Sequence, residues 1–297
     1  MQSIVNITTI LFYIGALLCG GYAARIAGPN NLEHLTGNGS KLLGAHSLAN
    51  PEFEVSTTCG DVLTGSHGRI EYTSGHAVGA EYCVWMVKSD LLSDFTFDIL
   101  QMDVFGGTQE YLKLTTFNYG SSHVQNVRVN TLGKFKISGN LVIISFLTSS
   151  AALIYKRLFV LEYISMPVRD MDISNKSVQT CQPGIEGGQS AQFKHPATDV
   201  QYANREFTVV LFTPPNWVYD FMQSRFEIKT VGLDASCLDT VTTFSMNYNG
   251  FYPISRVLCN ETTVRYDSSP IYVVVFQSDN ATVGTGFSIK YDWGPEM

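Results

Sequence analysis

The chain has 297 residues, which is enough for two domains of about 100–150 residues each or for one large β domain. Charged residues make up only 15% of the sequence, below the roughly 25% of a typical soluble protein, while 18 Phe, 15 Tyr and 3 Trp make it rich in aromatic side chains. This composition favours a β-sandwich or barrel over a helical fold, and the net charge of −7, spread without blocks, argues against nucleic acid as a partner.

An apolar segment near the start of the chain has the features of a secretory signal. Residues Ile7–Leu18 are mostly apolar but too few to span a bilayer. The small residues Gly21 and Ala23 then satisfy the small-x-small rule for cleavage. We therefore predict a signal peptide over 1–23 and secretion of the remaining chain, without membrane contact after cleavage. An uncleaved membrane anchor is the alternative, since no Lys or Arg precedes the apolar segment.

The next segment, 24–58, is rich in Gly, Asn and Ala and has no sustained period, which predicts a poorly ordered N-terminal extension. From Cys59 onward, apolar residues alternate with polar ones in short segments separated by Gly, Asn and Ser. This pattern predicts an antiparallel β-sandwich over 59–165. The expected strands include DFTFDI, the alternating segments around Leu114, Val127 and Ile137, and the apolar run LVIISF at 141–146.

A second series of strands follows a polar segment. Residues 166–180 are polar, begin near a proline, and are predicted to be a linker. The second domain is predicted over 181–293, with strands FTVVLF, FEIKTV, VTTFSM, IYVVVF and FSIKY. The two halves repeat a similar order of strands and acidic positions at a spacing of roughly 110 residues, which indicates domain duplication. The glycine-rich segment at 184–188 is predicted to be a turn.

The cysteines are interpreted in the light of secretion. Of the six, Cys19 lies in the predicted signal peptide. In an oxidising compartment the spacings suggest two disulfides, Cys59 with Cys83 and Cys237 with Cys259. Cys181 is then left over. It could form an interchain disulfide, but a buried free thiol or a nonstandard pairing within the chain is favoured over a covalent dimer.

Four N-x-[ST] acceptor sequences lie outside the predicted signal peptide. Because the chain is predicted to be secreted, each is a candidate N-glycosylation site on exposed surface. They are Asn38, Asn175, Asn260 and Asn280.

Short motifs in the two halves resemble those of a known family. The first half contains Cys59-Gly60, Gly68-Arg69-Ile70 and the C-x-W strand Cys83-Val84-Trp85-Met86-Val87. The second contains Cys237-Leu238-Asp239, Cys259, Phe276-Gln277-Ser278-Asp279 and Gly286-Phe287-Ser288-Ile289-Lys290-Tyr291. This combination resembles the CUB domain, the extracellular jelly-roll β-sandwich of complement proteases, astacin-like proteases, spermadhesins and cubilin. The resemblance implies an all-β chain of two CUB-like jelly-roll antiparallel sandwiches in tandem. Each half departs from the family pattern, since the first lacks the third and fourth cysteines and the second lacks the C-x-W strand.

The resemblance also implies a calcium site in the second domain. Many CUB domains hold calcium with three acidic residues, which correspond here to Asp234, Asp239 and Asp279. Carboxylate oxygens from several loops are suitable calcium ligands. The alternative is that these are ordinary loop aspartates, which are common at turns and strand ends. In the first half, Asp103 and Glu110 occupy the matching acidic places, but Ser149 replaces the third carboxylate and no strong calcium site is expected there.

Enzymatic activity is not expected, because the sequence contains no H-E-x-x-H, G-x-S-x-G or P-loop motif. The resemblance favours a secreted, non-enzymatic interaction module whose loops bind an extracellular protein ligand, with calcium ordering those loops in the second domain. The alternative function is a secreted carbohydrate-binding β-sandwich, because jelly rolls often carry sugar sites. In that case Trp217 would be the stacking residue, although a hydrophobic loop plug is the favoured role for this side chain.

Overall fold

The computed structural model of the protein describes eighteen ranges of the chain. They are 53–74, 80–103, 110–121, 123–148, 156–168, 180–187, 190–197, 200–213, 218–219, 222–230, 232–233, 238–247, 250–258, 262–267, 269, 271–279, 281 and 283–295. Within these ranges the regular structure consists of eighteen β-strands, all inside one compact unit, Leu48–Met297. No helix that could cross a membrane occurs in this described part. The all-β prediction is confirmed.

The strands of the first half form one hydrogen-bonded sheet with the main order β1-β3-β8-β4-β7-β5-β6, to which β2 and β12 add short pairings with β4. The first-half strands are β1 (Glu54–Ser56), β2 (Val62–Leu63), β3 (His67–Thr73), β4 (Ala80–Asp103), β5 (Tyr111–Phe117), β6 (Gln125–Val129), β7 (Gly133–Leu147) and β8 (Leu158–Pro167).

This sheet folds back on itself because β4 and β7 both continue through a bend. Their antiparallel register shifts between Lys88 and Ser93 of β4, opposite Leu141 and Gly139 of β7. A Cβ at Gly139 would lie 2.8 Å from Oδ1 of Asn118 and 3.2 Å from Cβ of Thr116, so glycine lets these side chains approach the bend closely. The bulge therefore divides one sheet into two packed layers.

The two layers of the first half enclose an aromatic core. The first inner layer consists of β5, β6, residues 80–88 of β4 and residues 141–147 of β7. The first outer layer consists of β1, β3, β8, residues 93–103 of β4 and residues 133–139 of β7. Trp85 and Phe146 of the inner layer meet Tyr72 and Phe159 of the outer layer. All four side chains are buried, which gives this half its own hydrophobic core.

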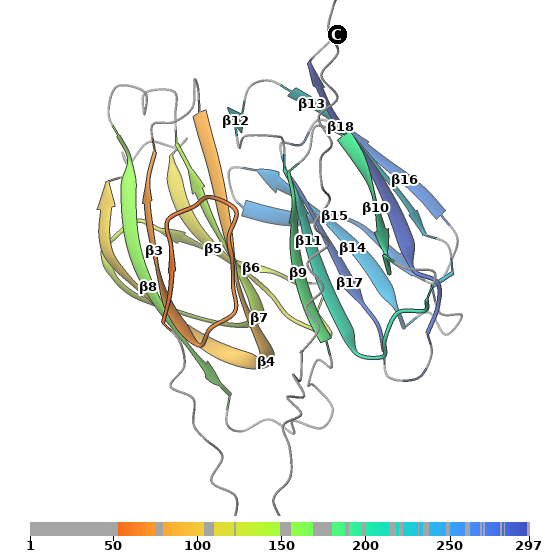
Figure 1. Ribbon diagram of the computed structural model, residues 1–297, viewed down its shortest axis with the longest axis horizontal. Helices are drawn as coiled ribbons and strands as arrows, with labels where there is room; N and C mark the ends of the chain where they lie inside the picture. The colour runs from red at the N-terminus through yellow and green to blue at the C-terminus, as the bar shows by residue number, and fades with distance from the viewer. Residues whose placement is uncertain are drawn as a thin grey trace, which may run out of the picture. The chain divides into compact units, whose positions relative to one another are not determined.

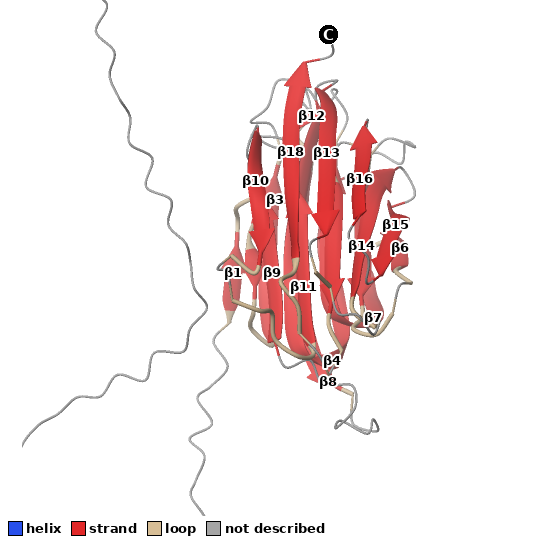
Figure 2. Cartoon of the chain, turned by 90° about the vertical axis from the view of Figure 1, so that its right-hand side faces the viewer, coloured by secondary structure: helices blue, strands red, loops and turns tan. Residues whose placement is uncertain are grey.

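The second half is a sandwich of two separate sheets. Its strands are β9 (Thr180–Glu186), β10 (Ser190–His195), β11 (Glu206–Phe212), β12 (Val218–Tyr219), β13 (Met222–Thr230), β14 (Thr240–Asn247), β15 (Gly250–Leu258), β16 (Thr262–Asp267), β17 (Tyr272–Gln277) and β18 (Phe287–Pro295). The second inner sheet has the order β15-β14-β17-β11-β9, and the second outer sheet has the order β10-β18-β13-β16, whose strands lie side by side in Figure 2. Phe212 and Tyr272 of the inner sheet pack against Phe226 and Tyr291 of the outer sheet.

The two sandwiches also share a third hydrophobic cluster. The second inner sheet lies between the strands of the first half and the second outer sheet (Figure 1). Val84 and Ile143 of the first half and Val209 and Val275 of the second half belong to this shared cluster, and all four are buried. The long apolar runs of the sequence are thereby explained, because a strand that is buried on both faces has no polar face.

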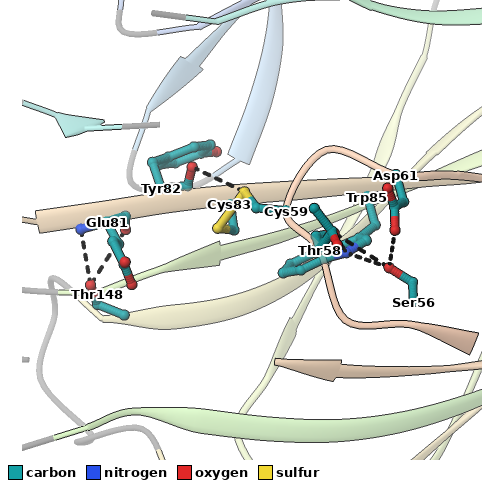
Figure 3. Close-up of a disulfide and its surroundings, with 9 residues drawn as sticks. All are labelled: Ser56, Thr58, Cys59, Asp61, Glu81, Tyr82, Cys83, Trp85 and Thr148. Carbon is teal, nitrogen blue, oxygen red and sulfur yellow. Dashed lines mark hydrogen bonds between the residues drawn. A yellow bond between two sulfur atoms is a disulfide. The ribbon is translucent and has the colours of Figure 1, made fainter. Parts of the chain in front are cut away.

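The disulfide predicted between Cys59 and Cys83 is confirmed, with the two Cα atoms 5.2 Å apart (Figure 3). It fixes the segment before β2 against β4. The indole N–H of Trp85 donates to the carbonyl of Thr58 at 2.7 Å and to the hydroxyl of Ser56 at 3.1 Å.

These contacts correct the predicted boundary of the N-terminal extension. Residues Glu54–Ser56 form β1, which pairs in parallel with β3, so the last part of 24–58 belongs to the first sandwich. No period is visible in this segment because β1 has only three residues. The predicted signal peptide, 1–23, and residues 24–52 lie outside the described residues.

The predicted linker at 166–180 and the predicted turn at 184–188 lie partly within the described residues. Met166 and Pro167, at the start of the predicted linker, complete β8, and Thr180 begins β9; residues 169–179 lie outside the described ranges. The turn predicted at 184–188 is wrong for 184–186, which continue β9. Because β9 is an edge strand paired only with β11, it tolerates proline and glycine that a central strand would not.

Candidate functional site

The candidate site lies at one end of the second inner sheet, where two predicted calcium ligands meet. Asp239 directly precedes β14, and Asp279 follows β17 by two residues. Because β14 and β17 are antiparallel neighbours with Thr240 opposite Gln277, the two aspartates come to the same edge. The backbone N–H of Asp279 donates to Oδ1 of Asp239 at 2.7 Å.

The two carboxylates differ in their surroundings. Asp239 is fully buried, and its Oδ2 accepts a hydrogen bond from the hydroxyl of Tyr202. Asp279 is partly exposed, and its Oδ1 accepts from the backbone N–H of Ala281 at 2.9 Å. Asp239 is therefore fixed by the interior of the domain, whereas Asp279 is only partly enclosed, although its Oδ2 atom is shielded from solvent.

The loop before β11 holds the segment that carries Asp279. Ser278 and Glu206 exchange two hydrogen bonds, from Ser278 N–H to the Glu206 carbonyl at 3.0 Å and from Glu206 N–H to the Ser278 hydroxyl at 2.8 Å. The Ser278 hydroxyl also donates to the carbonyl of Ala203 at 2.6 Å. Arg205, which has a left-handed φ of 53°, donates its N–H to the Asp279 carbonyl at 2.6 Å. The position of Asp279 thus depends on the 203–206 turn.

A buried histidine and glutamate pair lies beneath this turn. Nε2 of His195 is 2.7 Å from Oε1 of Glu206, and both side chains are buried. Burial alone would raise the pKa of Glu206, but the hydrogen bond and charge of His195, the Thr208 hydroxyl and the Ala203 N–H together lower it. Glu206 is therefore held as a carboxylate inside the domain.

The first half contributes directly to this end of the second domain. The hydroxyl of Tyr119 donates to the carbonyl of Ser278 at 2.5 Å. The side-chain amide of Gln277 accepts from Gly120 N–H at 2.6 Å and donates to the carbonyl of Ser121 at 3.1 Å. Gly120 has a φ of 76°, which glycine adopts without strain.

The electrostatic surroundings of Tyr119 confirm that the acidic pair is close to this loop. Burial raises the pKa of Tyr119; the positive charge of Arg205 opposes this, and the negative charges of Asp279 and Asp239 add to it. A tyrosine of the first half thus belongs to the same charged site as two aspartates of the second.

A small cavity of about 260 Å³ opens between these elements, and we call it the seam pocket. Its lining residues from the first half are Tyr119, Gly120 and Ser121, and those from the second half are Leu238, Thr240, Thr242, Gln277, Ser278 and Asp279. Nearly all of these side chains are polar.

A larger open groove of about 560 Å³ lies on the exposed face of the second outer sheet. Arg225, Glu227, Arg265, Lys290 and Asp292 line it with alternating charge. The Arg265 guanidinium pairs with Glu227 at 2.6 Å across β16 and β13. Mixed cross-strand charges of this kind are typical of a solvated sheet face.

The predicted site residues are only partly within the described structure. Asp239 and Asp279 are brought together as expected, while Asp234 lies outside the described residues. So do Cys237 and Cys259, the side chain of Cys181, the four candidate glycosylation sites and Trp217. Within the described part no group of three His, Cys, Asp or Glu side chains has the arrangement of a metal site.

The ligand atoms of Asp239 and Asp279 are of the type that binds calcium. Asp239 and Asp279 offer hard carboxylate oxygens at the edge of one sheet, which is the ligand type that calcium prefers. A carboxylate oxygen has two lone pairs, so it can accept a hydrogen bond and coordinate a cation at the same time. A third carboxylate would have to come from Asp234.

In the first half, the acidic residues have other roles. Glu110 forms a buried ion pair with Arg157, with Oε2 and Nε 3.0 Å apart. Asp103 is exposed at the end of β4, and Ser149 lies outside the described residues. Glu110 therefore stabilises the fold of the first sandwich.

Sequence analysis did not identify Tyr119, Tyr202, Gln277 or Glu206 as members of the site. Gln277 carried a signal, since it lies inside the F-x-S-D motif beside Asp279. Tyr119 carried none, because its contact with Ser278 joins residues 159 positions apart.

No family model matches the sequence, and no curated protein matches it. Among solved structures, the chain is similar to the CUB1-EGF-CUB2 domain of human MASP-1/3, with 11% identity and a TM-score of 0.33 over 77% of this chain and 100% of that one. It is similar to the CUB1-EGF-CUB2 domains of rat MASP-1, with 11% identity and a TM-score of 0.30 over 80% and 100% of the two chains. The full extracellular region of zebrafish Gpr126/Adgrg6 has 12% identity and a TM-score of 0.27, over 81% of this chain and 37% of that one. These similarities assign the chain to no family.

Proposed function

We propose that the protein is a secreted, non-enzymatic interaction module of two CUB-like sandwiches, which binds an extracellular protein ligand through the edge loops of its second domain. The observation that carries the proposal is the 2.7 Å hydrogen bond from the backbone N–H of Asp279 to Oδ1 of Asp239, which brings two acidic residues to one end of the second sandwich. A carboxylate that is already held in place loses little entropy on binding.

Calcium is proposed as the cofactor of this site, with Asp234, Asp239 and Asp279 as its ligands. The cation would offset the repulsion between the carboxylates and order the loops that carry them. In CUB domains that bind calcium, such loops present acidic side chains to a lysine of the partner. By resemblance, Asp279 is the residue that would face that lysine here, since it is the more exposed of the described pair.

Calcium titration by calorimetry tests the cofactor. We expect a Kd of about 10⁻⁴–10⁻³ M, the range of extracellular modules, and about 1 kcal/mol of stabilisation at millimolar calcium. Asp279→Asn should abolish the binding heat. Asp292→Asn, which removes an exposed carboxylate from β18, should leave it intact. An unchanged melting temperature and no heat in the wild-type protein would exclude the calcium site.

The protein ligand is tested by recovery of binding partners from extracellular fluid with immobilised protein. Partners that are retained in calcium and released by chelator support the proposal, and their loss after acetylation of partner lysines supports the proposed contact. Retention that is identical for wild-type protein and Asp279→Asn would show that binding occurs elsewhere.

Secretion, glycosylation and the remaining cysteines are further parts of the proposal. N-terminal sequencing of the expressed protein should begin near Ala23, and peptide mapping should find Cys237 bonded to Cys259. Electrophoresis without reductant should show a monomer if Cys181 forms no interchain bond. Mass spectrometry after glycosidase treatment would identify which of the four acceptor asparagines carry glycans.

A further inference from the structure

We propose that the seam pocket binds a single neutral sugar residue, and that both halves of the chain are required for this site. The proposal concerns a different ligand from the protein partner above, although Asp279 lines the pocket and is also one of the proposed calcium ligands. It starts from two threonines of β14, Thr240 and Thr242, which line the pocket.

Thr240 and Thr242 are more than nine-tenths buried as residues, and no side-chain hydrogen bond of either is found among the described residues; neither Oγ1 atom is enclosed without a partner, so both are open to the pocket. They share the face of β14 that carries Phe244 toward the first half, because side chains two positions apart point the same way. A hydroxyl that has no protein partner and is open to a pocket can bond the water or the ligand that the pocket holds.

The walls of the pocket are held in place before any ligand binds. The Gln277 amide joins the second half to Gly120 and Ser121 with two hydrogen bonds, and Tyr119 is fixed to the Ser278 carbonyl. The threonines lie on β14, which has a neighbouring strand on each side. A pocket built in this way loses little conformational entropy on binding.

The lining determines the charge of the ligand. Asp279 lines the pocket and the buried Asp239 lies directly behind it, while no Lys, Arg or His is among the lining residues. An anionic ligand would therefore be repelled. The volume of about 260 Å³ is below the roughly 300–1,000 Å³ of pockets for drug-sized ligands, so the pocket suits one small group.

The hydroxyls favour a polyol over an amine. Each threonine hydroxyl is a donor and an acceptor, and a sugar hydroxyl is both as well, so the pairing is complementary in either direction. An ammonium group only donates and would leave the threonine hydrogens without an acceptor. The apolar C–H groups of a sugar would contact Leu238, which is 63% exposed at the rim, and the Tyr119 ring.

Saturation-transfer NMR of the full chain with methyl glycosides of glucose, galactose, mannose, fucose and N-acetylglucosamine tests the proposal. At least one glycoside should bind saturably at about millimolar concentration, as expected for so small a ligand. The double variant Thr240→Val/Thr242→Val should bind about four- to a hundredfold more weakly, since each lost hydrogen bond is worth roughly two- to tenfold.

Thr243→Val is the matched control. Thr243 is on the same strand and is buried, but its position points it to the opposite face of the sheet, so affinity should stay within about twofold. Leu238→Arg is a second variant that places a bulky side chain at the rim; because Leu238 is exposed, the core should remain folded and glycoside binding should be lost. Thermal melting of each variant verifies its folding.

The proposal is overturned if no glycoside in the panel saturates the wild-type protein, or if the double threonine variant binds as well as wild type. Nα-acetyl-lysine methylamide is included as an amine probe. If it binds and the glycosides do not, the seam pocket is an amine site and the sugar assignment is wrong. Calcium titration of the double variant separates this result from the proposed function, because its calcium heat should be unchanged.

Discussion

The side-chain amide of Asn126 forms two hydrogen bonds with the backbone of Phe251 and so joins β6 of the first sandwich to β15 of the second. Nδ2 donates to the Phe251 carbonyl at 2.9 Å, and Oδ1 accepts from its N–H at 3.2 Å. Oδ1 also accepts from the Thr115 hydroxyl at 2.7 Å. A single side chain thus bonds both backbone groups of Phe251 and adds a polar contact to the hydrophobic contact between the sandwiches.

Asn126→Ala should therefore lower the free energy of unfolding by about 1–3 kcal/mol, because two or three hydrogen bonds are lost. Urea unfolding followed by fluorescence measures the change. Gln125→Ala is the control on the same strand, since Gln125 is exposed like Asn126 but has no side-chain hydrogen bond within the described part of the chain, and it should stay within about 0.5 kcal/mol of wild type. Equal effects of the two substitutions would show that the Asn126 contact contributes nothing to stability.

The ring pair Phe117–Phe244 tests whether the two sandwiches unfold together. Phe117 of β5 and Phe244 of β14 meet edge to face, with ring centroids 5.2 Å apart. Replacing each by Leu, singly and together, should give a coupling free energy of about 0.5–1.5 kcal/mol in a double-mutant cycle. The wild-type protein should show one calorimetric transition.

Phe95→Leu combined with Phe244→Leu provides the comparison for that cycle. Phe95 belongs to the core of the first sandwich and not to the shared cluster, so the two effects should add within about 0.5 kcal/mol. Two separate melting transitions, or no coupling between Phe117 and Phe244, would contradict a shared core.

The strands that pair alternating apolar and polar residues were predictable, and so were the apolar runs at Leu141 and Val273. The sheets that cover the two faces of those runs could not be predicted. An apolar run indicates that both faces are buried, but its pattern does not show which other strands bury them. The edge strand β9 was interpreted as a turn because its proline and glycines are typical of both.

The candidate site was predictable where it depends on local motifs. Asp239 follows a cysteine motif and Asp279 ends F-x-S-D, and both motifs lie at strand ends. Tyr119 could not be found in this way, because its place in the site depends on how the first sandwich packs on the second. The threonines of the seam pocket were counted as ordinary strand residues for the same reason.

Lys113 is a buried lysine on the face of β5 that belongs to the shared interface, and its Nζ lies 3.8 Å from the centre of the Tyr111 ring. Burial, and then the charge of Arg128, lower the pKa of Lys113 to about 8. The folded state therefore disfavours the charged amine. This destabilisation is fully present below about pH 8 and disappears as the pH rises toward the ordinary value of 10.5.

Lys113→Met should accordingly raise the free energy of unfolding at pH 7 by about 1–3 kcal/mol, and the advantage should shrink at pH 10. Urea unfolding at the two pH values measures both terms. Lys134→Met, which removes a lysine with a 70% exposed side chain, should change stability by less than about 0.5 kcal/mol at either pH. A gain for Lys113→Met that did not vary with pH would show that the amine is not the source of the effect.

The opposite sign is expected for Glu206, whose lowered pKa reflects a carboxylate that is stabilised by His195 and two further hydrogen bonds despite its burial. Its contribution to stability is fully present above the ordinary value of 4.5 and is lost as the pH falls through the lowered pKa. Glu206→Gln keeps the shape of the side chain but removes the charge. It should destabilise the protein by about 1.5–3 kcal/mol at pH 6, the range for hydrogen bonds to charged groups.

Because the variant lacks the titrating group, its stability should also fall less steeply than that of wild type as the pH drops below 4.5. Unfolding midpoints between pH 3 and pH 6 provide the measurement. Glu227→Gln makes the same substitution in the surface ion pair with Arg265, where solvent screens the charge, and should cost less than about 1 kcal/mol. The two hydrogen bonds between Glu206 and Ser278 use the Glu206 backbone, so the Gln variant keeps them. Parallel acid unfolding curves for wild type and Glu206→Gln would show that the charge of Glu206 does not contribute to acid stability.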